Sequence, residues 1–449
     1  MNQKVLIANR GEIAVRIIRA CHELGIATVA VFSTADQDSL HVKIADESIC
    51  VGGPSPHDSY LNINNIISAA IATGATMIHP GYGFLSENAQ FAEIVESCHL
   101  TFIGPTSLVI KTMGEKTNAK KIAKAARVPI IMGSEGTINS LTEGLMIARK
   151  VGFPVMLKAT NGGGGRGISI IRTPQEFKTM FTRTIHEAEA SFGNGHLYVE
   201  KYIEAPRHIE VQIFGDKHGN ILLLGERDCS LQRRNQKMVE ETPSPAISNS
   251  VRLRMGQAAI RLAKEINYTG AGTIEFLVDH KGNFYFIEMN TRIQVEHPVT
   301  ECVTGVDLVK EQIRVALDQP FSIKQHQIRK TGHAIECRIN AEDIDNNFLP
   351  SPGTINRLIL PGGLGIRVDT HIFAGYIVPS HYDSLLAKLI AFAPTRLEAI
   401  EKMRVALQQF IIEGVKTNID FLEYLMRTEA FINGQFDTNF ITQLLESAK

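Results

Sequence analysis

The chain has 449 residues, a length that corresponds to about three domains. Apolar residues make up 44% and charged residues 21%, which is ordinary for a globular protein and excludes a disordered chain. The 46 basic and 47 acidic side chains leave a net charge of −1, there is no Trp, and aromatic residues make up only 7%. Without a positive field or many stacking rings, a general nucleic-acid binder is not expected.

The pattern of apolar residues shows no secretion or membrane segment. Only four apolar residues, 5–8, follow Lys4 before Asn9 and Arg10, far fewer than a signal peptide needs. No stretch approaches the roughly 18 uninterrupted apolar residues of a membrane span. We therefore expect a cytoplasmic protein without a membrane partner. The six cysteines contain no C-x-x-C pair, which predicts reduced, mostly buried thiols rather than a zinc site or a disulfide framework.

The first hundred residues alternate short β-rich runs with amphipathic helical runs, the pattern of a doubly wound sheet. The expected strands are residues 5–8, 28–32, 76–79 and 101–103. The expected helices are residues 12–24, 62–72 and 86–98. The turn Asn9-Arg10-Gly11-Glu12 lacks the G-x-G-x-x-G spacing of a dinucleotide site, so a Rossmann-like fold is predicted and NAD binding is not.

A glycine-rich loop is the first candidate for ligand binding. After a basic helix at 116–126, a strand at 153–159 runs into Asn161-Gly162-Gly163-Gly164-Gly165-Arg166-Gly167. The β-branched run 168–171 predicts a second strand, so the loop closes a hairpin, whereas a P-loop needs a Lys-Ser/Thr pair and a following helix. Its backbone N–H groups are free to turn toward phosphates, and Lys158 adds a positive charge beside them. The alternative is a disordered surface turn.

A hairpin at residues 272–288 carries two glutamates. If its turn is centred between Lys281 and Gly282, Glu275 and Glu288 stand directly opposite each other on one face. Two carboxylates roughly 5 Å apart at Cβ repel each other unless one is protonated or a cation lies between them. Mg²⁺ takes one or two carboxylates together with nucleotide phosphate oxygens. The alternative is a solvated polar hairpin, and a bulge in the turn would shift the register.

The second strand of this hairpin is expected to continue through residue 296. Period two then places amide and ionisable side chains on one face: Glu288, Asn290, Arg292, Gln294 and Glu296. An exposed strand edge would tolerate such a row. Together with the glutamate pair, the row instead indicates the floor of a site, with metal ligands at one end and an Arg-Glu set for a small anion farther along.

Two further segments alternate polar with apolar residues, and each is also compatible with a sheet that has one wet side. The polar positions of the first segment are His208, Glu210 and Gln212. Those of the second are Glu336, Arg338 and Asn340. For His208, a structural hydrogen-bonding role is an equal alternative. A basic cluster in a Gly- and Pro-poor loop and one lysine of the basic helix are open between a surface role and ligand binding: Arg227, Arg233, Arg234, Lys237 and Lys116.

Beyond residue 330 the pattern changes again. Strands are expected near residues 333–340 and 384–391, and helices at roughly 396–413, 419–426 and 440–447. The chain contains no internal repeat, low-complexity tract or long flexible linker. We therefore expect domains that pack closely together.

Four segments together carry a family resemblance. They are Asn9-Arg10-Gly11-Glu12-Ile13-Ala14, His79-Pro80-Gly81-Tyr82-Gly83-Phe84-Leu85-Ser86-Glu87-Asn88, the glycine loop, and Glu288-Met289-Asn290-Thr291-Arg292-Ile293-Gln294-Val295-Glu296-His297-Pro298. Over about residues 2–445 the chain resembles the biotin carboxylase family, the ATP-grasp subunits of bacterial acetyl-CoA carboxylase. The resemblance implies an α/β and α+β fold in three parts. These are a Rossmann-like N-terminal domain (1–114), an ATP-grasp central domain (115–330) with a glycine-rich lid at about 130–203, and a C-terminal biotin carboxylase-type α+β domain (331–449).

The resemblance also implies the reaction. MgATP activates bicarbonate to carboxyphosphate, and N1′ of biotin is then carboxylated, which is the first half-reaction of acetyl-CoA carboxylase in malonyl-CoA and fatty acid synthesis. Mg²⁺ or Mn²⁺ is implied, with two ions accompanying ATP. Because no Met-Lys-Met biotinylation site is present, biotin is expected as a substrate on a separate carrier protein. The other implied partners are carboxyltransferase subunits and a second copy of the chain in a homodimer.

The resemblance implies roles for the individual residues that match the family's motifs. ATP would be held by Lys116, Lys158, Gly164, Gly165, Glu200, Lys201, Tyr202, Ile203, His208 and Asn235, together with the metal-binding carboxylates. The metal ligands would be Glu275, Glu288 and Asn290. Bicarbonate would be held by Lys237, Arg292, Gln294 and Val295, with Glu296 as the base that removes its proton. Biotin would lie near Tyr82 and Gly83, with Arg338 stabilising its enolate.

One position departs from the family pattern Q-R-R-H-Q-K, because Asn235 stands where that pattern has His. An Asn side chain donates and accepts hydrogen bonds but cannot carry charge. We therefore expect retained activity with a changed KM for ATP.

Two other functions stay open on the sequence. Another ATP-grasp ligase, such as a carbamoyl phosphate synthase-like enzyme, would use the same MgATP apparatus to make a different acyl phosphate. The segments 79–88 and 292–296 favour bicarbonate and biotin instead. The second alternative is a catalytically silent nucleotide-binding or scaffold subunit. An intact set of acidic and guanidinium groups argues against it: Glu275, Glu288, Arg292 and Glu296.

Overall fold

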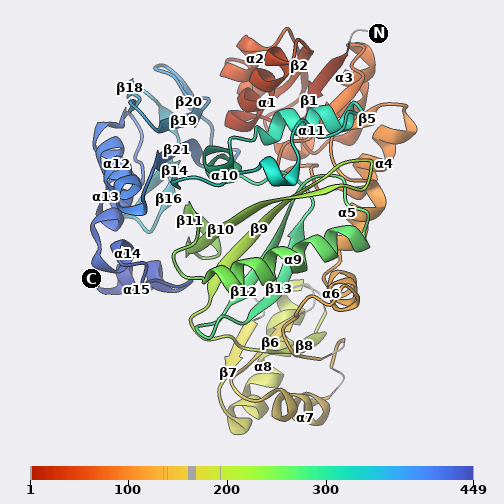
Figure 1. Ribbon diagram of the computed structural model, residues 1–449, viewed down its shortest axis with the longest axis vertical. Helices are drawn as coiled ribbons and strands as arrows, with labels where there is room; N and C mark the ends of the chain where they lie inside the picture. The colour runs from red at the N-terminus through yellow and green to blue at the C-terminus, as the bar shows by residue number, and fades with distance from the viewer. Residues whose placement is uncertain (1–2, 135, 139, 160–167, 193, 448–449) are drawn as a thin grey trace.

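The computed structural model describes residues 3–134, 136–138, 140–159, 168–192 and 194–447. Figure 1 shows an N-terminal unit at the top, a small sheet with its helices at the bottom, and a central sheet between them. The C-terminal helices lie along one side of this central sheet.

A five-stranded parallel sheet forms the N-terminal unit, with the strand order β3-β2-β1-β4-β5. Its strands are β1 Lys4–Ile7, β2 Ala27–Ser33, β3 Glu47–Gly52, β4 Met77–His79 and β5 Thr101–Phe102. Its helices are α1 Gly11–Glu23, α2 Leu40–Ile44, α3 Ile63–Ala72 and α4 Ala89–Ser97. The Rossmann-like fold is confirmed. The sequence pattern misses β3 because only Ile49 and Val51 of this edge strand face the core, while Glu47, Ser48 and Cys50 are exposed.

A smaller three-stranded antiparallel sheet has the strand order β7-β6-β8. It is reached from the N-terminal unit through α5 Ser107–Gly114 and α6 Lys116–Ala125. Its elements are α7 Leu141–Val151, β6 Val155–Ala159, β7 Ile168–Ile171, α8 Pro174–Phe192 and β8 Leu197–Lys201. The hairpin of β6 and β7 is as predicted. The glycine loop that connects them, with Gly164 and Gly165, lies outside the described residues.

An eight-stranded antiparallel sheet crosses the middle of the molecule, with the order β13-β12-β9-β10-β11-β14-β21-β19. Its first five strands are β9 Arg207–Gly215, β10 Ile221–Arg233, β11 Gln236–Thr242, β12 Gly270–Val278 and β13 Phe284–Asn290. The other three are β14 His333–Asn340, β19 Ile366–Thr370 and β21 Leu385–Ala393. Because β11 pairs with β14, the sheet continues across the domain boundary expected near residue 330. The exact domain limits stay a prediction.

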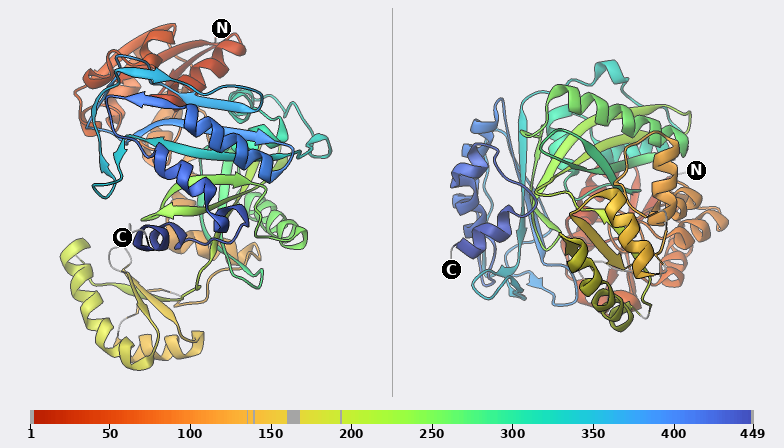
Figure 2. Two further views of the ribbon diagram at one scale, coloured as in Figure 1. Left: turned by 90° about the vertical axis from the view of Figure 1, so that its left-hand side faces the viewer. Right: turned by 90° about the horizontal axis from the view of Figure 1, so that it is seen from below.

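Helices cover both faces of this sheet. α9 Asn249–Glu265 packs on the apolar side of β9 and β10, whereas α10 His297–Thr304 and α11 Leu308–Ala316 lie on the opposite side. The C-terminal helices are α12 Arg396–Gln409, α13 Ile419–Arg427, α14 Glu429–Ile432 and α15 Phe440–Ser447. Figure 2 shows the C-terminal helices packed on the far end of the sheet, where they bury one apolar core. Short strands join these elements: β15 Glu342–Asp343, β16 Leu349–Pro350, β17 Gly353–Thr354, β18 Arg357–Ile359, β20 Ile377–Val378 and β22 Ile411–Glu413.

Two expectations about surface and redox chemistry can be compared with this fold. Within the part of the chain that the structure describes, no helix has both the length and the apolar character needed to cross a membrane. The six cysteines are free thiols. Cys21, Cys229 and Cys337 are buried, two others are partly buried, and Cys50 is exposed.

Candidate functional site

The hairpin of β12 and β13 places Glu275 opposite Glu288, as predicted. The register arises differently, however. Val278 pairs with Phe284, which centres the turn on Lys281, and a bulge between the turn and the glutamates shifts the register by one residue. A bulge was expected to move the two glutamates apart; here it brings them opposite each other.

The two glutamates have opposite electrostatic surroundings. Glu275 accepts hydrogen bonds from His208 (2.8 Å), Lys237 (2.9 Å) and Asn290 (2.9 Å). Burial alone would raise the pKa of Glu275, but the charges of Lys237 and His208 hold it far below its usual value. The pKa of Glu288 is raised by burial and by the charge of Glu275, with Lys116 opposing. A cation bound nearby would therefore stabilise the ionised form of Glu288 more than that of Glu275.

The donor chemistry of this hairpin fits a hard divalent cation. Glu275 and Glu288 offer carboxylate oxygens, and Asn290 adds a carboxamide oxygen that accepts from Arg292 at 3.0 Å. Ligand atoms of His208, Glu210 and Glu275 also lie within 4.8 Å of one another. Lys237 already donates to both of those carboxylates, so the Glu288 side of the hairpin is the better place for a metal ion.

The expected strand through residue 296 is wrong, because β13 ends at Asn290. Residues 291–296 form a turn, which we call the anion turn, that leads into α10. Arg292 nevertheless donates to Gln294 (2.9 Å), and Gln294 donates to Glu275 (3.2 Å). The polar residues converge through the turn's own hydrogen bonds and not through strand periodicity.

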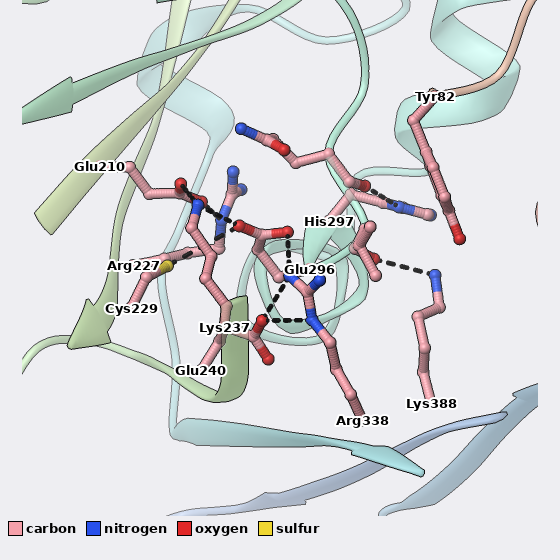
Figure 3. A network of polar contacts seen from close by, with 12 residues as sticks. Tyr82, Glu210, Arg227, Cys229, Lys237, Glu240, Glu296, His297, Arg338 and Lys388 are labelled. Carbon is pink, nitrogen blue, oxygen red and sulfur yellow. Dashed lines mark hydrogen bonds and ion pairs between the residues drawn. The ribbon is translucent and has the colours of Figure 1, made fainter. Parts of the chain in front are cut away.

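Glu296 lies at the centre of a buried polar network (Figure 3). Lys237 donates to its Oε1 at 2.7 Å, and Arg338 donates to its Oε2 at 3.0 Å. Burial would raise the pKa of Glu296, but Lys237, Arg338 and Arg227 hold it well below its usual range. The carboxylate has no exposed surface and is reached through Lys237 and Arg338. These two cations would therefore meet an entering anion first.

The polar side of β9 is buried, so the alternative of a sheet with one wet side is wrong for this strand. On β14, Glu336 is fully buried, whereas Arg338 and Asn340 are half-buried. Glu210 and Gln212 have no exposed surface. Arg227 does not belong to a surface loop: it lies within β10, fully buried, and pairs with Glu210. The physical reason is α10, which packs against β10, β11 and β14 and excludes water from this face.

The other end of the site is rich in lysines. Lys158 on β6 donates to Glu200 at 2.6 Å, and Lys120 on α6 contacts the other oxygen of the same carboxylate. Burial and neighbouring lysines lower the pKa of Lys120 and of Lys158 to about 8. Lys201 instead donates to the backbone carbonyls of residues 152 and 153. The carboxylate of Glu200 thus neutralises only one of the two ammonium charges. The remaining positive charge is available to bind another anion.

Asn235 lies at the tip of the β10–β11 hairpin. Arg234 and Asn235 have φ angles of 50° and 65°, so both occupy the left-handed region of a two-residue turn. Asn adopts this conformation more readily than most residues. Next to it, Arg233 stacks on the ring of Phe348 (4.1 Å) and donates to Asn347 (2.8 Å). Asn at position 235, where the family pattern has His, is therefore compatible with this turn.

One cavity of about 1460 Å³ connects these groups. Its lining contains most of the predicted site residues: Tyr82, Gly83, Lys116, Lys158, Glu200, Lys201, Tyr202, Ile203, His208, Asn235, Lys237, Glu275, Glu288, Asn290, Arg292, Gln294, Val295 and Arg338. Tyr82 enters the cavity from the N-terminal unit and Arg338 from β14, so three parts of the chain contribute. The cavity is large enough for a nucleotide and a second small substrate.

Comparison with known proteins agrees with this geometry. Residues 1–110 match the biotin carboxylase N-terminal domain, 115–324 the carbamoyl-phosphate synthase L chain ATP-binding domain, and 336–443 the biotin carboxylase C-terminal domain. A biotin carboxylase of Nostoc is 55% identical over 98% of this chain and 99% of its own length. The chain belongs to the biotin carboxylase family. Biotin carboxylase 1 of Bacillus subtilis is 54% identical, over 98% of each chain.

Solved biotin carboxylases share the fold. The Campylobacter jejuni enzyme in complex with β,γ-ATP has a TM-score of 0.93 and 46% identity, and 98% of each chain is covered. The biotin carboxylase domain dimer of Hydrogenobacter thermophilus 2-oxoglutarate carboxylase, in complex with MgADP, ADP and bicarbonate, has a TM-score of 0.92 and 51% identity over 98% of this chain and 97% of that one. The chain is thus an ATP-dependent ligase with a biotin carboxylase N-terminal domain, an ATP-grasp domain and a biotin carboxylase C-terminal domain.

Three polar residues of this biotin carboxylase site escape the sequence reasoning. Lys120 follows Lys116 by one helical turn, so its position on the same helix face could have been inferred. Lys388 is a lone lysine in the apolar run of β21, which indicates a buried, paired ammonium. Glu240 shares Arg338 with Glu296, and its pKa is raised to about 7 by burial and by the charge of Glu296, against the effect of Arg338. Nothing in the local sequence around Glu240 signals this contact.

Proposed function

We propose that this chain carboxylates N1′ of biotin on a separate carrier protein, with carboxyphosphate made from bicarbonate and MgATP as the intermediate. The observation that carries the proposal is Glu296, which lies directly behind the cavity wall: its two oxygens are held by Lys237 and Arg338, and these two residues line the same cavity as the metal-type hairpin. The base, two cations that can bind an anion, and the lysine-rich end that can bind a nucleotide therefore lie close together. Formation of carboxyphosphate and carboxylation of biotin can be coupled only if these groups are close together.

The bicarbonate subsite is proposed to comprise Lys237, Arg292, Gln294 and the backbone of Val295. A bicarbonate ion between these groups shares the positive charge that otherwise belongs to Glu296. As Lys237 and Arg338 turn toward the new anion, the pKa of Glu296 rises from its depressed value. The carboxylate thereby becomes a better base at the moment when the proton must leave bicarbonate.

The metal subsite is proposed on Glu275, Glu288 and Asn290, with Mg²⁺ or Mn²⁺ and two ions accompanying ATP. A bound ion supplies positive charge to the phosphate oxygens. The raised pKa of Glu288 supports this assignment, because the group gains a cation it otherwise lacks. The solved Hydrogenobacter domain is in complex with MgADP.

The nucleotide subsite is proposed at the lysine-rich end. Lys116 and Lys158 supply charge for the phosphates, and the segment Glu200–Ile203 with His208 completes the pocket beside Asn235. His208 is held by Glu275, whose charge raises its pKa against the effect of burial. The glycine loop, with Gly164 and Gly165, is proposed to cover the phosphates.

The biotin subsite is proposed between Tyr82, Gly83 and Arg338. Arg338 donates to both Glu240 and Glu296, so its guanidinium plane is fixed in the cavity wall. A fixed guanidinium stabilises negative charge that develops on the ureido oxygen of biotin.

The wider assembly follows from the same proposal. We propose a cytoplasmic homodimer that receives a biotin carboxyl carrier protein and works with carboxyltransferase subunits in acetyl-CoA carboxylase, for malonyl-CoA and fatty acid synthesis. The 2-oxoglutarate carboxylase small subunit of Hydrogenobacter thermophilus is 51% identical to this chain. The carrier protein must therefore be identified by direct carboxylation assays with candidate carriers.

The decisive experiment measures labelled carboxybiotin formed from free biotin, ¹⁴C-bicarbonate and MgATP. The proposal predicts acid-labile label in biotin that depends on all three substrates. A carbamoyl phosphate synthase-like enzyme would instead give carbamoyl phosphate with ammonia and no biotin product. ATP binding without turnover under saturating biotin and bicarbonate would indicate a silent subunit.

A further inference from the structure

A lysine buried in the C-terminal unit reaches the anion turn. Lys388 lies on β21, and its side chain has no exposed surface. Its Nζ donates to the carbonyl oxygen of Val295 at 2.9 Å and lies 3.1 Å from Oε1 of Glu12 on α1. Figure 3 shows Lys388 extended toward this turn from the strand below it. One ammonium group thus joins segments from three distant parts of the sequence.

The anion turn needs such a donor because it lies outside every sheet. Buried carbonyls that have no ladder partner must find donors among side chains or lose stability. The carbonyl of Gln294 accepts from His297 at the start of α10 (2.8 Å). The carbonyl of Val295 accepts from Lys388, a residue of another unit. Lys388 therefore ties the turn's backbone to the C-terminal unit, in addition to the side-chain contact between Arg338 and Glu296.

Glu12 extends the link to the biotin side of the cavity. The hydroxyl of Tyr82 donates to Oε1 of Glu12, the same oxygen that pairs with Lys388. Asp369 adds a second carboxylate 4.0 Å from the lysine. A fully buried ammonium is costly unless carboxylates compensate it, and a neutral side chain would satisfy the Val295 carbonyl without that cost. The charge matters because it holds Glu12, and through Glu12 the Tyr82 hydroxyl.

We infer that Lys388 is a positioning residue that sets the anion turn against the loop of Tyr82 and Gly83, which we call the biotin loop, by holding the Val295 carbonyl and Glu12 together. It touches neither substrate and acts through Val295 and Tyr82. The inference rests on the proposed function, because the turn and the loop matter together only if bicarbonate and biotin meet there.

The test compares KM values of purified full-length variants in bicarbonate-dependent ATP hydrolysis, with and without free biotin. In Lys388→Met, the turn loses its anchor, and we expect the KM for bicarbonate to rise about 10- to 100-fold, as for other small misplacements of binding groups. The KM for ATP should change less than about twofold, because Lys388 has no contact with the nucleotide end. Lys388→Arg keeps a charged donor and should restore most of the bicarbonate affinity.

Arg396→Met is the matched control. Arg396 also pairs with a buried carboxylate, Glu241, and donates to the carbonyls of Phe431 and Ile432, but it lies away from the cavity lining. Its loss should lower the melting temperature without changing the KM for bicarbonate. If Lys388→Met does not fold, Glu12→Gln takes its place, since it removes the partner charge from Lys388 with little change in shape. A rise in the KM for bicarbonate of about threefold or more is then expected.

Two results would overturn the inference. One is a folded Lys388→Met, or in its place Glu12→Gln, with the bicarbonate KM of the parent chain. The other is an equal rise in the KM values for ATP and bicarbonate, which would indicate a general loss of structure. Failure of the parent chain to show any bicarbonate-dependent turnover would refute the proposed function instead, so the two failures are distinguishable.

Discussion

The two ends of the cavity manage charge in different ways. At the anion turn, Glu296 is neutralised by Lys237 and Arg338 through short, well-formed hydrogen bonds. At the nucleotide end, Lys120 and Lys158 share the single carboxylate of Glu200, and burial together with the charges of neighbouring lysines lowers the pKa of each to about 8. One end is already balanced, whereas the other carries a surplus of positive charge.

The difference separates two tasks. In a cluster whose charges are balanced, the geometry is fixed. The carboxylate becomes available as a base only when another anion binds the two cations, which suits a proton-transfer step. A surplus of ammonium groups near their pKa binds a polyanion strongly and responds to pH. Substitutions at the two ends should therefore change different kinetic parameters.

The largest effect is expected from Glu296→Gln. Loss of the base should reduce bicarbonate-dependent turnover by about 10²- to 10⁴-fold, the usual contribution of a general base. Nucleotide binding, measured by titration calorimetry with ADP, should stay nearly intact because the lysine end is untouched. Unaltered turnover would remove Glu296 as the base.

Glu288→Gln should raise the Mg²⁺ concentration needed for half-maximal activity by about tenfold or more, as is typical for loss of a metal-site carboxylate contact. The measurement is an Mg²⁺ titration at fixed ATP. Asp279→Asn is the matched control, since Asp279 lies in the same hairpin and bonds only to its turn, at Lys281 and Asn283. An unchanged Mg²⁺ dependence in Glu288→Gln would contradict the metal assignment.

The lysine end predicts a pH effect of intermediate size. Each ammonium loses its proton as pH rises through about 8, and phosphate oxygens bind the charged form. The KM for ATP should therefore rise between pH 7 and pH 9, by at most about tenfold per unit and per proton. Lys158→Arg, which stays charged, should flatten the profile. A parent profile that is already flat would show that these lysines do not titrate against the nucleotide.

The smallest effect is expected from Asn235→His. Asn235 fits its left-handed turn position, so restoring His should change the KM for ATP by less than about threefold and leave kcat almost constant. Steady-state kinetics with varied ATP is sufficient. Activity that appears only in the His variant would overturn the view that the present chain is active.

The sequence predicts which reactive side chains lie together along a strand or turn. It does not predict which helix packs over them. The Glu275–Glu288 pairing depends on a short turn, so its register can be inferred even though the turn centre and the bulge differ from expectation. The convergence of Arg292 and Gln294 was predicted from a strand that ends before them. Side chains of alternating polarity kept their common direction because the anion turn bonds them to one another.

Burial could not be inferred for the polar face of β9 or for Glu336 on β14. Alternation in a strand shows which side chains share a face, but it does not show what covers that face. The covering helix α10 lies many residues away in the sequence, and its packing against β10, β11 and β14 decides the matter. The same limit applies to Lys388, whose partners Glu12 and Val295 come from other units.

The central claim is that bicarbonate itself attacks the γ-phosphate of ATP in the enclosure around Glu296. Turnover with ¹⁸O-labelled bicarbonate in unlabelled water tests it most directly, with mass analysis of the phosphate released. The account predicts one ¹⁸O atom transferred to phosphate for each biotin carboxylated, and in Glu296→Gln a rate of transfer that falls in step with turnover. Phosphate that carries only solvent oxygen, while ATP is consumed, would contradict it.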